Sequence, residues 1–233
     1  MWRENGFEIV GQAISYRSAI SYIRSSGAEL VVCFEKPPEL DAVRLTESLT
    51  ELNGPLCIVV SPDSSSERIR QCFLSGAVDY LTGPVSVNAL ADSLQTALKK
   101  LKSVIRSTEY RIAADEYFGT LEEKVVNGTF LKNLKAFIAD NEDTVVSTQT
   151  AAEYFGFNKD YFGRMFRSEI GMTFGEFYKR FRMVYAERLL KTGRYRVHEV
   201  SDMLGFSTAD YFTSEFKKYT GMKPLDVRKR EKP

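Results

Sequence analysis

The chain has 233 residues, of which 43% are hydrophobic and 27% are charged, and its formal net charge is +1. This length allows one large domain or two modest ones, and the composition is that of an ordinary globular protein. No apolar run approaches the roughly 20 residues that a membrane-spanning helix needs, and no signal peptide is visible. We therefore expect a cytoplasmic protein with no membrane partner.

Residue types that carry metal or nucleophile chemistry are scarce. The cysteines Cys33, Cys57 and Cys72 lack metal-ligand spacing, and His198 is the only histidine. Cysteines in apolar runs are by default reduced and buried. Without a lysine-bearing phosphate loop, an HExxH pattern or a nucleophile with a histidine partner, we expect no metal, no cofactor and no enzymatic activity.

Residues 1–106 alternate short apolar runs with amphipathic segments. The runs at 7–10, 30–34, 56–60 and 77–81 have strand length, and helical patterns occupy 13–26, 40–52, 64–75 and 86–106. Continuous apolar strands that alternate with helices predict an α/β domain, in which a parallel sheet is covered on both faces.

The last of these helices carries one apolar stripe, formed by Leu90, Leu94, Leu98, Leu101 and Ile105. Core packing accounts for its first half. Its second half, about 99–111, has the spacing of a short coiled coil that pairs two chains, although it is shorter than three to four heptads. We predict a connector at 107–128, possible coiled-coil dimerisation through this region, and a homodimer.

A stretch that occurs twice dominates the rest of the chain. The first copy, GFNKDYFGRMFRSEIGM, covers 156–172, and the second, GFSTADYFTSEFKKYTGM, covers 205–222. A short helical pattern that ends in glycine precedes each copy, at 150–156 and 199–205. Each copy therefore predicts a helix, a tight turn and a second helix, the form that places a helix in the major groove of DNA. A plain helical bundle with a duplicated hairpin is the alternative.

The turn chemistry supports this prediction. Gly156 and Gly205 can adopt the left-handed conformation that closes the first helix, and Asn158, with Ser207 or Thr208 in the second copy, can cap the next helix. The stripes Phe162, Phe166 and Ile170, and Phe212, Phe216 and Tyr219, are expected to form core.

Residues 129–230 resemble the DNA-binding domain of AraC/XylS-type transcription regulators. The motifs that carry the resemblance are RFRMVYAERLLKTG at 180–193 and VSDMLGFSTADYFTSEFKKYTGMKPLDVRK at 200–229. The resemblance implies an all-α domain at 129–233, with two helix-turn-helix units joined by a linker helix. Its expected partners are double-stranded DNA, through the major groove, and RNA polymerase.

The resemblance also assigns roles to residues. Recognition helices at 158–170 and 208–219 would bring to the bases Asp160, Gly163, Arg164, Ala209, Asp210, Thr213 and Ser214. Arg164 is the best single candidate, because a guanidinium can grip guanine with two hydrogen bonds. Asp160 and Asp210 equally fit a role at the helix dipole. Phosphate contacts are expected from Lys159, Arg167, Arg180, Arg182, Arg194, Lys217 and Lys218. Packing against the linker helix's neighbours is the alternative for Arg182.

Residues 1–106 resemble a response-regulator receiver domain, which is flavodoxin-like. The motifs are GFEIVGQA at 6–13, AELVVCF at 28–34 and SGAVDYLTGPVSVNAL at 75–90. Met1 aligns just before the family's second strand, so the family's first strand and its acidic pair have no counterpart. A start annotated too late, a truncated gene and a sheet closed up with four strands are the open explanations.

The receiver chemistry is degenerate. The phosphate-accepting Asp position matches Phe34, the Lys position matches Gly83, and Ser61 keeps the Ser/Thr position. Glu35 stands beside Phe34 and could act as a constant mimic of the phosphate, but alternation along a strand would turn it away from the site unless the strand end turns. We predict a sequence-specific DNA-binding transcription regulator that is not controlled by Asp phosphorylation. The alternative is an interaction remnant without DNA affinity, which titrates an intact paralogue.

Overall fold

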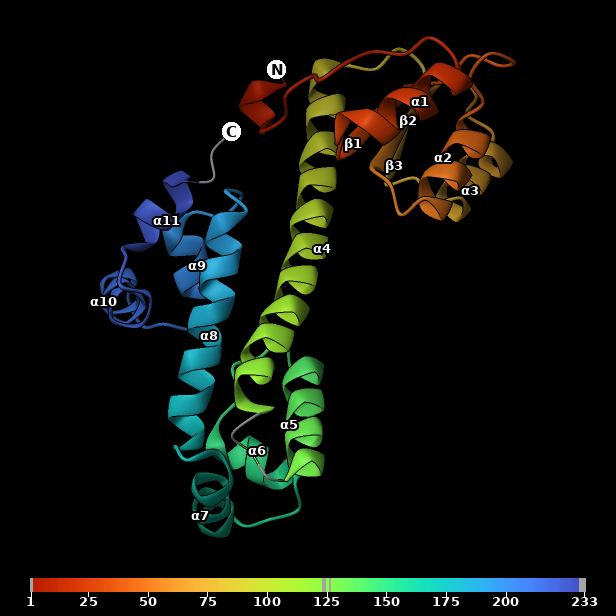
Figure 1. The fold of residues 1–233 in the computed structure, drawn as a ribbon. Helices are drawn as coiled ribbons and strands as arrows, with labels where there is room; N and C mark the ends of the chain where they lie inside the picture. The colour runs from red at the N-terminus through yellow and green to blue at the C-terminus, as the bar shows by residue number, and fades with distance from the viewer. Residues whose placement is uncertain (1, 123–124, 126, 231–233) are drawn as a thin grey trace. The chain divides into compact units, whose positions relative to one another are not determined.

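The computed structural model describes residues 2–122, 125 and 127–230. The chain divides into two compact units, Met1–Val104 and Ile105–Pro233, and helix α4 (Val87–Glu122) contributes to both (Figure 1). Each unit is treated by itself below. Within the described ranges, no helix combines the length and the apolar character required to cross a membrane.

The first unit is an α/β domain with a small parallel sheet. Its strands have the order β1-β2-β3, and Val32 pairs with Ile58, and Val60 with Leu81. Its elements are the 3-10 turn η1 (Arg3–Asn5), α1 (Tyr16–Ser26), β1 (Leu30–Phe34), α2 (Ala42–Glu51), β2 (Leu56–Ser61), α3 (Ser66–Leu74), β3 (Asp79–Thr82) and the first part of α4.

Helices cover both faces of this sheet. Cys57 and Val59 of β2 face a cluster that includes Leu45 and Leu49 of α2, whereas Ile58 faces Leu94 of α4. Successive side chains of a strand point to opposite faces, so a strand buried on both sides must be apolar throughout. The prediction of a parallel sheet covered on both faces is confirmed.

The predicted strand at 7–10 is wrong. These residues have no regular secondary structure, and the sheet of the described residues has three strands. Ile9 and Val10 are 53% and 55% exposed, and the carbonyl of Val10 accepts a hydrogen bond from the Tyr22 hydroxyl. Only Phe7 of this segment packs against a core cluster, so the segment gains too little from burial to form a strand.

The three cysteines are free and buried, as expected. Burial raises the pKa of the Cys33 thiol to about 12, so the thiol is protonated at neutral pH and is a weak nucleophile. A search of the described residues finds no group of three or more His, Cys, Asp and Glu side chains that could hold a metal ion.

The second unit is all-α and is built around α8 (Phe174–Lys191). The α8 side chains Phe177, Phe181 and Leu189 are completely buried. The other helices of the unit are the second part of α4, α5 (Gly128–Asp140), α6 (Thr148–Tyr154), α7 (Lys159–Ile170), α9 (Val197–Met203), α10 (Ala209–Thr220) and α11 (Pro224–Arg230).

Much of the predicted connector, 107–128, lies in α4 and packs into the core of this unit. Tyr110, Ala113, Tyr117 and Phe118 are buried there. The Tyr110 ring meets Phe181 edge-on, with 5.1 Å between centroids. Spacings of three and four residues place these side chains on one stripe of α4. This stripe is buried against other helices of the same chain. Positions 123–124 and 126 of the predicted connector lie outside the described residues.

Candidate nucleic-acid interface

Two helix pairs, α6–α7 and α9–α10, are closed by the turns that the sequence predicts. Gly156 and Gly205 have φ angles of 72° and 67°, in the left-handed region where a β-carbon is disfavoured. The Asn158 side chain accepts a hydrogen bond from the Tyr161 amide at 2.8 Å. Thr208, rather than Ser207, caps the second pair and accepts from the Tyr211 amide at 3.1 Å. The predicted turns and caps are therefore confirmed.

The buried faces of α7 and α10 agree with the prediction except at one residue. Phe162, Phe166 and Ile170 are buried, and so are Phe212 and Phe216. Tyr219, which was expected in this stripe, is 42% exposed. A spacing of four residues from Phe216 leads to Thr220, which is partly buried and whose hydroxyl donates to the Phe216 carbonyl at 2.9 Å. Thr220, not Tyr219, is therefore the counterpart of Ile170.

The outer face of α7 is polar and cationic. Lys159, Asp160, Arg164 and Arg167 are exposed, and Asp160 lies in the first turn. Among the described residues, Arg164 has no ion pair. A β-carbon built on Gly163 would meet nothing within 4 Å. Arg167 likewise has no ion pair among the described residues. This face therefore offers two uncommitted guanidinium groups, with the open backbone of Gly163 next to Arg164.

The outer face of α10 has a different composition. Ala209, Asp210 and Ser214 are exposed and Thr213 is half-buried. Ser214 occupies the position that Arg164 has in α7, so this helix presents no long hydrogen-bonding side chain there. Its cations, Lys217 and Lys218, lie in the last turn and are exposed. The duplicated pairs thus share a scaffold but differ in the groups that they present.

The other predicted phosphate contacts belong to α8 and the segment after it. Arg180 is exposed and pairs with Glu176 at 2.5 Å, and Arg194 is half-buried. Arg182 packs inside the unit, with its guanidinium carbon 4.2 Å from the Phe206 ring centroid. Burial lowers its pKa. These contacts favour the packing alternative over the phosphate-contact interpretation of Arg182, because its half-buried guanidinium stacks on Phe206.

Sequence reasoning overlooked two features of this unit. Lys179 of α8 pairs with Glu215 of α10 at 2.9 Å, and this bond raises the pKa of Lys179 and lowers that of Glu215. No local sequence pattern marks a pair 36 residues apart. Tyr161 and Tyr211, at matching positions of the two copies, are both 47% exposed. Comparison of the copies could have identified these tyrosines.

The receiver-like positions of the first unit hold a buried carboxylate. Phe34, at the end of β1, is 59% exposed. Glu35 has a side chain that is only 2% exposed, and it accepts hydrogen bonds from Ser61 Oγ at 2.6 Å and from the Ala42 amide at 3.1 Å. Arg68 Nη2 also donates to Glu35 and pairs with Asp41 at 3.0 Å. Gly83, after β3, has a φ of 69°.

The expectation that Glu35 turns away is therefore wrong. The strict alternation of side chains stops because β1 ends at Phe34, and the following chain bends through a bridge between Lys36 and Leu40. Although burial disfavours the charged carboxylate, the bonds from Arg68, Ser61 and Ala42 hold the pKa of Glu35 below its ordinary value. Glu35 is consequently charged at neutral pH.

Comparison with known proteins agrees with this geometry. Residues 151–230 match the family described as a helix-turn-helix domain. An uncharacterized response regulatory protein of Staphylococcus epidermidis is 25% identical over 231 residues, which are 99% of this chain and 91% of that protein. The transcriptional regulatory protein HptR of Staphylococcus aureus is 24% identical over 232 residues, with the same coverage.

One similar solved structure is part of a response regulator. The C-terminal domain of the two-component response regulator yesN of Fusobacterium nucleatum is 27% identical, with a TM-score of 0.37, and the match covers 41% of this chain and 98% of that domain. The resemblance that the sequence suggested is confirmed at this level: residues 151–230 match a helix-turn-helix domain family, and the relatives that match nearly the whole chain are response regulatory proteins.

Proposed function

We propose that the chain is a sequence-specific DNA-binding transcription regulator whose recognition helices are α7 and α10. The observation that carries this proposal is the exposed outer face of α7, which presents Arg164 without an ion pair in the described structure. The face lies within the matched helix-turn-helix region. Two helix-turn-helix units joined by α8 would place α7 and α10 in successive major grooves on one side of the duplex.

The two helices would contribute differently to DNA binding. Arg164 can grip guanine O6 and N7 with two hydrogen bonds, which discriminates against another base by about 1–3 kcal/mol. Asp160 and Asp210 lie in the first turns of their helices, where a carboxylate can accept from cytosine or stabilise the helix dipole. Lys217 and Lys218 fit phosphates, which set affinity and register without reading sequence. We therefore expect most of the sequence discrimination to come from α7.

Control of this activity would not use Asp phosphorylation in a flavodoxin-like first unit. Phe34 has no group that accepts a phosphoryl group, and Gly83 has no charge to neutralise one. Glu35 already fills the neighbouring space with a carboxylate bonded to Ser61 and Arg68. Incorporation of phosphate from acetyl phosphate would overturn this part of the proposal.

The alternative function is an interaction remnant that pairs with an intact paralogue and titrates it. Such a remnant needs no DNA affinity, so nothing would maintain the cations on the outer face of α7. A homodimer, contact with RNA polymerase and a cytoplasmic location remain predictions of the regulator proposal.

Selection of random DNA duplexes on the purified full chain tests the proposal. We expect a motif in two blocks about one helical turn apart, and a steep decrease in affinity with salt. Arg164→Ala should weaken binding to the selected duplex and relax one position of the motif. Arg70→Ala, at an exposed arginine of α3, serves as a matched control and should leave the affinity and the motif unchanged. Failure to enrich any motif, with no salt-sensitive binding, would favour the remnant.

A further inference from the structure

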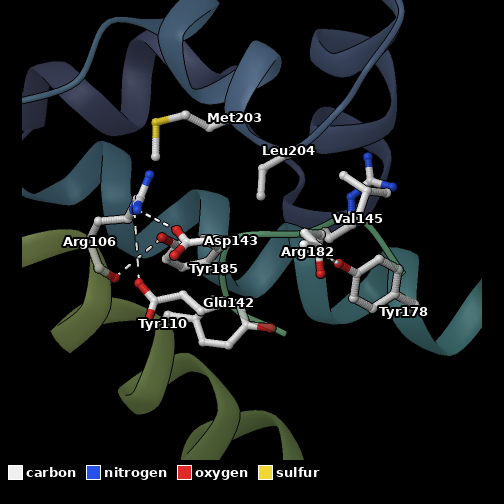
Figure 2. A pocket seen from close by; sticks show the side chains of 11 residues that line it. Arg106, Tyr110, Glu142, Asp143, Val145, Tyr178, Arg182, Tyr185, Met203 and Leu204 are labelled. Atoms are coloured by element: carbon white, nitrogen blue, oxygen red, sulfur yellow. Dashed lines mark hydrogen bonds and ion pairs between the residues drawn. The ribbon is translucent and has the colours of Figure 1, made fainter. Parts of the chain in front are cut away.

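A cavity of about 220 Å³ lies inside the second unit. Its walls come from α4, the loop between α5 and α6, α8 and the end of α9 (Figure 2). The loop that contributes Val145 leads into the first helix pair, and Leu204 ends the first helix of the second pair. A β-carbon on Gly205 would stand 2.7 Å from Val145. The cavity therefore lies where the two helix pairs meet.

One end of the cavity carries excess negative charge. Arg106 Nε lies 3.8 Å from a Glu142 oxygen, and Arg106 Nη2 donates to Asp143. Glu142 also accepts from Ser107 Oγ at 2.8 Å. A single guanidinium thus faces two carboxylates, of which Glu142 is 20% exposed and Asp143 is 72% exposed. This end therefore has an excess of one formal negative charge and is open to solvent on the Asp143 side.

The opposite end carries a positive charge that has no carboxylate partner among the described residues. Figure 2 shows Arg182 beside Tyr178 and Val145, away from Arg106, Glu142 and Asp143. The Arg182 Nε is buried and has no hydrogen-bond partner among the described residues, and no described carboxylate pairs with its guanidinium. The guanidinium is half-buried and stacks on the Phe206 ring, so a carboxylate of a ligand here would supply the hydrogen-bond acceptor that the buried Nε lacks.

The wall between these ends is largely apolar. Figure 2 shows Met203 and Leu204 along one side of the cavity, and the ring of Tyr185 also lines it. The Tyr185 hydroxyl is already used, because it donates to the Arg106 carbonyl at 3.2 Å. This part of the cavity therefore suits methylene groups better than further polar groups.

We propose that the cavity binds a small zwitterion, with its ammonium group toward Glu142 and Asp143 and its carboxylate at Arg182. The volume corresponds to roughly seven waters, at about 30 Å³ each, which fits a linear amino acid and excludes a nucleotide. The cavity is lined by the loop that leads into the first helix pair and by the end of α9 in the second pair, so a bound ligand would favour one arrangement of this loop against α9. Ligand and DNA would then change each other's affinity by the same factor, a consequence that rests on the proposed function.

Calorimetric titration of the full chain, without DNA, tests the binding step. The probes are three zwitterions of increasing span (4-aminobutanoate, 6-aminohexanoate and 8-aminooctanoate) and the singly charged analogues hexanoate and hexylamine. We expect at least one zwitterion to bind about tenfold more tightly than both analogues, because each end adds a charge-assisted hydrogen bond. Equal affinity for hexanoate or hexylamine, or no binding of any zwitterion at about 10 mM, overturns the proposal.

Variants locate the binding site. Arg182→Gln should weaken the best zwitterion about tenfold and leave hexylamine unchanged. Arg180→Gln, whose arginine is exposed and pairs with Glu176, is the control and should change neither. Undiminished zwitterion binding by folded Arg182→Gln overturns the proposal. If that variant does not fold, the probe comparison on the unaltered chain decides. Because no DNA is present, these results are independent of the duplex selection.

Discussion

The buried carboxylate of Glu35 allows a quantitative test of what holds the first unit together. Glu35→Gln preserves the shape of the side chain but removes its charge and directs an amide nitrogen at one of its donors. Arg68 then loses its strongest partner while only 19% of its side chain is exposed. Removing one partner of a buried ion pair costs about 3–5 kcal/mol. Because Arg68 keeps Asp41 and some contact with solvent, we expect about 2–3 kcal/mol.

Urea unfolding of the full chain measures this cost. Trp2 is the only tryptophan, and it packs against the cluster around Ile58 and Leu94, so its fluorescence reports the first unit alone. Glu47→Gln, at an exposed glutamate of α2, is the matched control and should stay within about 0.5 kcal/mol of the unaltered chain. A Glu35→Gln variant as stable as that control would refute the reasoning.

Three further predictions concern pH, the turns and the lysines of α10. The pKa of Glu35 is lowered in the folded state, so its contribution to the stability of the first unit is present above about pH 4.5 and is lost as the pH falls below that value. In Glu35→Gln, the stability reported by Trp2 fluorescence should therefore depend less on pH below about pH 4.5 than in the unaltered chain. Gly156→Ala should lower the free energy of unfolding by about 1–2 kcal/mol, because the backbone is left-handed there. Gly205→Ala should lower it further, because its β-carbon would also meet Val145. Equal melting temperatures of the two variants would contradict this prediction. Replacing Lys217 and Lys218 with alanine should remove about two phosphate contacts, so the slope of log affinity against log salt concentration should fall by about two, while the selected motif stays unchanged.

The parts of the fold that could be predicted from the sequence depend on local chemistry. Gly156, Asn158 and Gly205 determine their turns through their own backbone preferences and side-chain oxygens, so the duplicated pairs could be predicted. The prediction of a strand at 7–10 failed because strand formation depends on pairing with a neighbouring strand and on a buried face. Tyr219 was placed in the buried stripe because its ring is more apolar than the side chain of Thr220. The spacing of four residues from Phe216 leads to Thr220, and this spacing decides which side chain faces the core.

The candidate site was predictable to a similar degree. The polar face of α7 follows from helical periodicity, so the positions of Lys159, Arg164 and Arg167 could be predicted. The interior position of Arg182 depends on Phe206, which follows it by 24 residues and reaches it only through the packing of α9 against α8. Side chains whose environment is made by distant segments cannot be placed from periodicity alone.

The ionic network and the cavity together indicate where a signal can act on this chain. A switch needs two states within a few kcal/mol of each other. The Glu35 carboxylate is held by Ser61, Arg68 and the Ala42 amide, so a second state at this edge of the sheet would have to break several charge-assisted bonds. At Arg182 the imbalance is opposite, because the half-buried guanidinium has a buried Nε without an acceptor and no carboxylate partner among the described residues. A ligand that supplies a carboxylate there gains free energy in the arrangement that closes around it. We therefore expect a soluble zwitterion, rather than phosphoryl transfer to the first unit, to change DNA affinity.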